Sequence, residues 1–156
     1  MIDNPSKLRY SFRVPDLELP RENVVMRWSP HAQAKETKRV RDWVWAHAIR
    51  DGFAHAVVLD KAHLKITIRG KYLAARDPRA TWTKDLIDAL VAREEFVRVQ
   101  TGAVTSTGKP KMKTIKDGSL RWGLIEDDNR ACIGTPEIVE EVQDAAEVKI
   151  EVYDVE

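Results

Sequence analysis

The sequence predicts an α+β fold, a single domain with one mixed β-sheet and two main helices packed on it. Three segments alternate apolar and polar residues, as half-buried strands do, and two longer segments carry apolar residues at helical spacing. The chain has 156 residues, enough for one domain that buries its own core. Strands interspersed with helices in this way predict helices covering one sheet, and the direction of the strands stays open.

The first predicted element is a strand at residues 8–14. Apolar residues occupy every second position there, and Pro15 ends the alternation. Residues 15–23 are polar and contain prolines, so we expect a loop. Residues 24–28 then predict a short extended piece.

The first helix is predicted from Ser29 to about Asp51. Serine is a preferred N-cap and Pro30 suits the first turn, whereas Gly52 is suited to end a helix. The apolar stripe of this helix is predicted to consist of Val40, Trp43, Val44, His47 and Ala48.

A second strand is predicted at residues 64–69, where apolar and polar residues again alternate. It leads to Asp77, which we therefore expect at a strand-to-helix junction. The next helix is predicted over residues 81–93, with Lys84 and Asp88 one turn apart. Its apolar face is predicted to consist of Leu86, Ile87, Leu90 and Val91.

Residues 96–120 are predicted to be an insertion that forms a β-hairpin with a basic tip. An apolar strand-like start is followed by a stretch of Gly, Thr and Ser and then by closely spaced lysines. An acidic turn at residues 123–129 comes next, and its apolar lead-in predicts that it is anchored to the core. Beyond a segment that runs to about residue 143, the last strand is predicted at residues 148–152.

Net charge and cysteine content limit which partners and which cellular compartment the sequence predicts. The formal net charge is only +1, so the overall charge neither requires nor excludes a nucleic-acid partner. The single cysteine, Cys132, cannot form an internal disulfide, which is typical of a reducing compartment. No N-terminal segment resembles a signal peptide, and no segment is apolar enough to span a membrane. We therefore expect a cytoplasmic protein without a membrane partner.

Two segments carry the residues with the clearest chemical meaning. Asp77 precedes the helix of Lys84 and Asp88, and the Asp127-Asp128 turn could fold back onto them. Carboxylates from separate segments around one lysine suit a hard cation bridging to a phosphate, because magnesium takes oxygen ligands and keeps part of its water shell. Plain structural explanations exist too, namely an Asp-Pro turn, a solvated acidic turn and an ordinary helical ion pair.

Other familiar chemistries are missing from the sequence. It contains no P-loop, no dinucleotide-binding glycine pattern and no serine-hydrolase elbow. Its four histidines lack the spacing of a zinc site.

The two segments resemble the RusA family of Holliday-junction resolvases, phage-type endonucleases that cut four-way DNA. The family pattern is an Asp-x-Asp-Asn stretch, a helix with Lys and, four residues later, Asp, and a Gly-hydrophobic-hydrophobic-x-Asp-Asp turn. Asp77, Lys84 and Asp88 match the first aspartate, the lysine and the helical aspartate. The turn Gly123-Leu124-Ile125-Glu126-Asp127-Asp128 matches the third part, and the similarity in element order extends over residues 29–153.

The resemblance implies a magnesium-dependent endonuclease that resolves four-way junctions in recombination and repair, acting as a homodimer on branched DNA. It implies Asp77, Lys84 and Asp128 as catalytic residues. The implied metal ligands are Asp77, Asp88, Asp127 and Asp128, with Asp128 the stronger candidate of the acidic turn. Arg79 and Ala80 depart from the pattern, since they stand where the family has its second aspartate and its asparagine.

Basic residues flank the acidic segments on both sides in sequence, as phosphate-binding walls around a metal would. The predicted nucleic-acid-binding residues are Arg69, Lys71, Arg76, Arg79, Lys109, Lys111 and Lys113, with Lys116 and Trp82 as further candidates. Two alternatives stay open. One is a catalytically degenerate RusA-like DNA-binding protein, favoured by Arg79 and Ala80, and the other is a protein-interaction module whose acidic turn is only surface.

Overall fold

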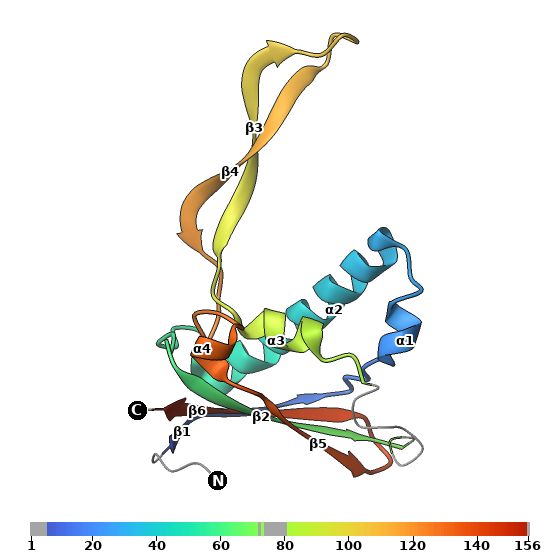
Figure 1. Cartoon of the computed structure of the whole chain (residues 1–156), viewed down its shortest axis with the longest axis vertical. Coiled ribbons are helices and arrows are strands. Elements are labelled where there is room, and N and C mark those ends of the chain that lie inside the picture. Colours follow the sequence, from blue (N-terminus) through green and yellow to red (C-terminus); the bar gives the residue numbers. More distant parts are fainter. Residues whose placement is uncertain (1–5, 72, 74–80, 156) are drawn as a thin grey trace.

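The computed structural model describes residues 6–71, 73 and 81–155, and it has the predicted α+β architecture. A four-stranded mixed sheet has the order β1-β6-β2-β5, and β3 and β4 form a separate two-stranded sheet. Helices cover one face of the larger sheet (Figure 1). In chain order the elements are β1 (Ser6–Pro15), α1 (Glu22–Val25), α2 (Pro30–Ala48), η1 (Ile49–Phe53), β2 (Ala62–Gly70), α3 (Lys84–Leu90), β3 (Glu94–Val104), β4 (Pro110–Leu120), α4 (Arg130–Ile133), β5 (Glu137–Val142) and β6 (Glu147–Val155).

The three alternating segments form three neighbouring strands of the larger sheet, β1, β6 and β2. β6 pairs antiparallel with β1 and β2, and β5 adds to β2 in parallel. Alternate residues of β2 and β6 are fully buried beneath the helices, with Ile66 opposite Ile150 at the middle. A register shift between Leu8 and Tyr10 turns Leu8 away from the buried face, so that its side chain is 47% exposed.

The helix α2 begins at the predicted signal, and helical backbone continues beyond Ala48 through η1 to the predicted glycine. The Ser29 hydroxyl accepts a hydrogen bond from the Ala32 amide, and Gly52 interrupts the π-helical turn η1 with a φ of 98°. The predicted stripe is partly wrong, because Trp43 is exposed and its indole donates to the Pro15 carbonyl. The half-buried tryptophan is Trp45, which donates to the Ala89 carbonyl on α3.

Three local expectations are corrected. The loop and extended piece predicted before Ser29 contain the short helix α1. The second main helix is shorter than predicted, because α3 spans only Lys84–Leu90 and Val91 is already extended. The segment before the last strand contains α4 and the edge strand β5, which the sequence did not reveal.

The predicted hairpin insertion is confirmed by the antiparallel pair β3–β4. Its tip is closed by hydrogen bonds between Thr105 and Lys109 at 2.8 Å and by Gly108 with a φ of 81°. The hairpin projects away from the sheet and the helices, which we call the body (Figure 1). Among the described residues, no helix is both long and apolar enough to cross a membrane.

Candidate active site

The acidic turn folds back onto the end of α3, as the sequence predicted. The amides of Leu124 and Ile125 both donate to the Leu90 carbonyl, and the Ala92 amide donates to the Ile125 carbonyl. Leu124 and Ile125 are fully buried, so the turn is anchored in the core. The base of the hairpin lies between the two joined segments, because β3 leaves after Ala92 and β4 returns before Gly123.

Gly123 explains why the turn begins with a glycine. A Cβ atom at this position would lie only 2.3 Å from the Ala92 amide nitrogen, which belongs to the backbone and cannot rotate away. The close approach of the two backbones therefore requires glycine here.

Asp88 of α3 and Asp128 of the turn meet beside Arg93. The Arg93 guanidinium lies 3.4 Å from an Asp88 oxygen and 3.9 Å from an Asp128 oxygen. Burial is the largest cause that raises the pKa of Asp88, and the positive charge of Arg93 opposes this rise. A hydrogen bond with Asp128 and the negative charge of Asp128 raise the pKa of Asp88 further. Two carboxylates that compete for one proton are a pair that a cation would stabilise.

Asp127 has a different role in the turn. Its carboxylate accepts hydrogen bonds from the Asp128 amide at 2.7 Å and from the Asn129 side chain at 3.0 Å. The bond from the Asp128 amide is the largest cause that lowers the pKa of Asp127. Asn129 in turn caps α4 through the Cys132 amide. Asp127 therefore shapes the turn, whereas Asp128 presents its carboxylate toward Asp88.

Lys84 is exposed at the first position of α3 and lines the same pocket as Asp128. The pocket has a volume of about 370 Å³ and is lined by Glu22, Thr81, Trp82, Thr83, Lys84, Ile87, Asp128, Ile133 and Pro136. Within the described chain, no ion pair joins Lys84 to Asp88. The charge of Lys84 nevertheless favours the ionised form of Asp88 and so opposes the rise in its pKa. Lys84 is therefore directed to the pocket rather than held in a helical ion pair.

Asp85 supports this pocket from behind, and sequence reasoning missed it. The side chain is 6% exposed, and its two oxygens accept hydrogen bonds of 2.8 Å from the Thr37 hydroxyl and the Trp82 indole. The carboxylate therefore ties α3 to α2 and holds Trp82 at the pocket. The available signal was its helical phase, since Asp85 lies one turn before the buried Ala89.

Arg93 and Arg121, at the two ends of the hairpin, were also missed. The Arg121 guanidinium donates to the carbonyl oxygens of Asp88 and Val91, and it lies 5.8 Å from the centre of the Trp45 ring. It thereby satisfies carbonyls at the C-terminal end of α3, where a cation is favourable. Arg93 and Arg121 lie near the acidic residues because the two strands of the hairpin pair with each other. The spacing of residues in the sequence does not reveal this proximity.

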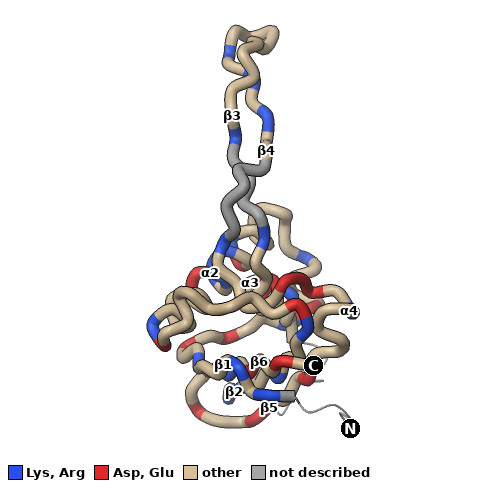
Figure 2. The backbone as a smooth tube through the Cα atoms, turned by 90° about the vertical axis from the view of Figure 1, so that its left-hand side faces the viewer, with Lys and Arg blue, Asp and Glu red and all other residues tan. Residues whose placement is uncertain are grey.

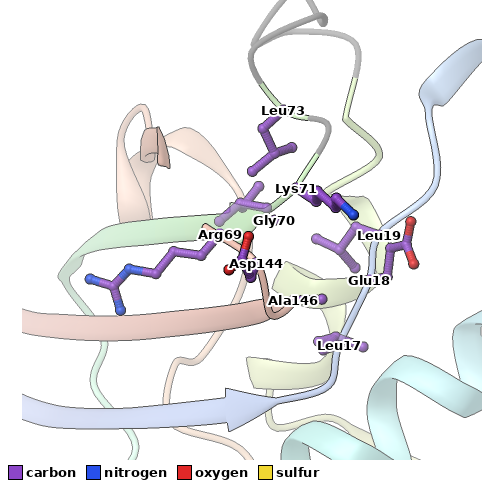
Figure 3. Close-up of a pocket in the computed structure, with 10 residues that line it drawn as sticks. Leu17, Glu18, Leu19, Arg69, Gly70, Lys71, Leu73, Asp144 and Ala146 are labelled. Atoms are coloured by element: carbon purple, nitrogen blue, oxygen red, sulfur yellow. The ribbon is translucent and has the colours of Figure 1, made fainter. Parts of the chain in front are cut away.

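The predicted basic residues that the structure describes lie in two separate places. Asp77, Arg76, Arg79 and Ala80 lie outside the described residues. Arg69 makes ion pairs of 2.8 Å with both Glu141 and Glu147, so its charge is balanced by neighbouring strands. Figure 3 shows the Arg69 guanidinium pointing away from a second pocket, of about 240 Å³, that it lines with Lys71. Lys109 lies in the turn that closes the hairpin, and Lys111 and Lys113 follow at the start of β4.

The described part of the chain holds no group of three or more His, Cys, Asp or Glu side chains arranged to bind a metal ion. Asp88 and Asp128 supply two carboxylates, and Asp77 precedes the pocket residue Thr81 by four positions. No protein-family model, curated protein or solved structure matches this chain. Its function is therefore inferred from its own residues.

Proposed function

We propose that this chain is a RusA-like, magnesium-dependent endonuclease that acts in the cytoplasm on four-way DNA junctions. The observation that carries the proposal is the meeting of Lys84, Asp88 and Asp128 along one side of α3. These residues come from segments about forty positions apart, and they are the residues that match the RusA pattern.

The carboxylate pair fits a hard cation. The negative charge of Asp128 is one of the causes that raise the pKa of Asp88, and a divalent ion bound between the two carboxylates would offset both negative charges. Asp88 and Asp128 would hold the ion, with Asp77 as a further ligand by resemblance. Asp127 is the weaker candidate, because hydrogen bonds within the turn already engage its two oxygens.

When bound, magnesium would lower the pKa of a coordinated water and offset charge on the scissile phosphate. Lys84 would contact a phosphate oxygen from the rim of the pocket and stabilise the negative charge that develops there. Trp82, held by Asp85, and Ile87 form the apolar wall against which a sugar or base would rest. Symmetric cleavage of two strands of one junction implies a homodimer, in which each protomer supplies one such site.

A second candidate function is a DNA-binding protein that has lost cleavage. Arg93 lies close to both carboxylates and supplies a positive charge where a metal would lie. Arg79 adds a second guanidinium in place of a family carboxylate. An internal cation at this place would compete with magnesium and could replace it altogether.

Cleavage of a labelled synthetic four-way junction tests the first function. Wild-type protein is expected to cut only with magnesium or manganese, and Asp128→Asn and Asp77→Asn are each expected to lower cleavage by at least about a hundredfold. Asp42→Asn is the matched control, since Asp42 pairs with Lys38 and Arg41 on α2, away from the pocket residues. Full activity in either variant would remove that residue from the site.

Lys84→Ala separates catalysis from binding. It is expected to lower the cleavage rate more than junction affinity, because its proposed contact strengthens in the transition state. Unchanged turnover with a lower melting temperature would show a structural lysine instead.

The two functions diverge in their response to removing the competing cations. If the chain is a nuclease held back by them, Arg93→Ala and Arg79→Asp are expected to raise magnesium affinity in calorimetry and to raise the cleavage rate. Junction binding without cleavage in wild type and in both variants would establish the non-catalytic function. Absence of junction binding under all of these conditions would favour a protein-interaction module.

A further inference from the structure

The outer part of the β3–β4 hairpin is a strongly basic surface without acidic residues. Residues 96–116 contain no Asp or Glu, and the cations of this stretch are Arg98, Lys109, Lys111, Lys113 and Lys116. Figure 2 shows Lys and Arg, and no Asp or Glu, along the coloured outer part of the hairpin. A net charge of +1 for the whole chain therefore conceals a concentrated positive charge at one end.

No acidic residue is interspersed among the hairpin cations in sequence, whereas acidic residues are interspersed among the cations of the body. In the body, Arg69 is paired with two glutamates and Lys38 with Asp42. Within the described residues, no ion pair involves Arg98, Lys109, Lys111 or Lys113, and all four side chains are exposed. These exposed positive charges are therefore available to bind a polyanionic partner.

The register of the hairpin places cations on both of its faces. Arg98 lies opposite Thr114, and Val99 lies opposite Lys113. Paired residues project to the same face of a ladder and consecutive residues to opposite faces, so Arg98 and Lys113 project to opposite sides. Lys111, two positions before Lys113, shares its face. A ribbon that lay flat on a surface would need cations on one face only, whereas these cations suit a partner that surrounds the ribbon.

We propose that the β3–β4 hairpin is an arm that inserts into the major groove of duplex DNA. A major groove about 12 Å wide admits a two-stranded ribbon, and phosphates then line both of its sides. Strands of eleven residues are about 35 Å long, comparable to one helical turn of DNA. The deep, narrow major groove of double-stranded RNA does not admit such a ribbon.

Exposed apolar side chains on the same arm are consistent with a groove. Val104 is 70% exposed, and Met112 is 38% exposed among the lysines. Side chains of this kind contact thymine methyl groups, which lie in the major groove. The choice of DNA as the polyanion rests on the proposed function, whereas insertion follows from the charges and dimensions of the hairpin.

The test compares two triple variants by fluorescence anisotropy with EDTA present, so that cleavage plays no part. One carries Lys109→Gln, Lys111→Gln and Lys113→Gln. The matched control carries Lys7→Gln, Lys35→Gln and Lys61→Gln, which removes the same charge from exposed positions of the body. The probes are a DNA duplex, a double-stranded RNA of equal length, and vesicles containing anionic lipid.

The hairpin variant is expected to bind the DNA duplex at least about tenfold more weakly at low salt, with a salt slope shallower by about 2 to 3, because each lost phosphate contact removes about 0.9 from that slope. The control is expected to change little, and RNA binding is expected to fall much less than DNA binding. Equal losses on DNA and RNA would overturn groove insertion. Unchanged DNA binding, or a loss confined to vesicles, would overturn the DNA-binding arm.

The outcomes also separate this inference from the nuclease proposal. Arm-dependent DNA binding without any cleavage would reject the nuclease and keep the arm. Cleavage that persists while the lysine variant binds duplex DNA like wild type would reject the arm and keep the nuclease.

Discussion

The four-stranded sheet and the β3–β4 hairpin both contain antiparallel ladders, yet the two regions differ in what surrounds the ladder. Helices cover one face of the sheet, and residues such as Ile66 and Ile150 are fully buried there. Cross-strand ion pairs occur in this sheet, such as those of Arg69 with Glu141 and Glu147. The described outer part of the hairpin has no comparable cover, and its cations lack partners.

This difference shows where stability and binding reside. Burial of apolar surface stabilises the body, whereas a two-stranded hairpin alone is only marginally stable in water. The hairpin is therefore expected to contribute little to global stability and much to any electrostatic interaction. Three pairs of substitutions and one pH dependence probe this division and the packing of the body.

The largest expected effect concerns the core that anchors the acidic turn. Ile125→Ala removes fully buried atoms and is expected to lower the free energy of unfolding by about 2–5 kcal/mol in urea titration. Ile115→Ala on the hairpin removes a side chain that is 38% exposed, and it is expected to cost less than about 1 kcal/mol. Similar losses would mean that the hairpin is part of the cooperative core.

The next largest effect is the loss of stability when either of two glycines with different surroundings is replaced. Gly123→Ala forces a Cβ atom against the Ala92 backbone and is expected to cost about 1–3 kcal/mol or more. Gly102→Ala, in β3, has open space around it and only a φ of 84° to strain, so about 1 kcal/mol is expected. Thermal unfolding of both variants measures the difference, and a milder effect at Gly123 would contradict the close approach.

Asp85→Ala tests the buried carboxylate behind the pocket. The substitution leaves the Trp82 indole without its acceptor and leaves the Thr37 hydroxyl with only the Gln33 carbonyl, so a loss of about 1–3 kcal/mol is expected. Asp42→Ala, which breaks solvent-accessible pairs with Lys38 and Arg41, is expected to cost less than about 1 kcal/mol. If both variants unfold alike, Asp85 does not tie the helices together.

The smallest expected effect is a pH dependence. Because the pKa of Asp88 is raised in the folded state, the folded protein binds this proton more tightly than the unfolded chain does. Its contribution to stability is present at acidic pH and is lost as pH rises from the ordinary carboxyl pKa through the raised value. Asp88→Asn is therefore expected to gain melting temperature relative to wild type at neutral pH, and less so at acidic pH. A constant difference across pH would contradict the raised pKa.

Sequence patterns predicted the elements whose signals are local. Ser29 and Gly52 mark the first long helix because a cap and a left-handed residue act within one turn. The alternation in β2 and β6 predicted buried strands, and Pro110 and Gly108 lie where the hairpin turns. β5 escaped detection because only partly buried residues occupy this edge strand, so it lacks a clear alternation.

The candidate site shows where sequence reasoning stops. The resemblance to the RusA pattern named Lys84, Asp88 and Asp128, and the structure brings them together along one side of α3. The guanidinium of Arg93 between the carboxylates could not be predicted, because its position depends on how the hairpin leaves the helix. Asp85 was missed because its burial depends on partners from other segments.

The bonds at the base of the hairpin have a consequence for folding kinetics. The Leu124 amide donates a hydrogen bond to the Leu90 carbonyl although 34 positions separate the two residues. This contact alone would close a long loop. Pairing of β3 with β4 brings Glu94 opposite Leu120 and shortens the effective loop to a few residues. Because loop-closure entropy grows as about 3/2 RT ln n, early zipping of the hairpin would lower the cost of that contact by about 2 kcal/mol. A segment that adds little to the final stability would in this way speed the assembly of the site.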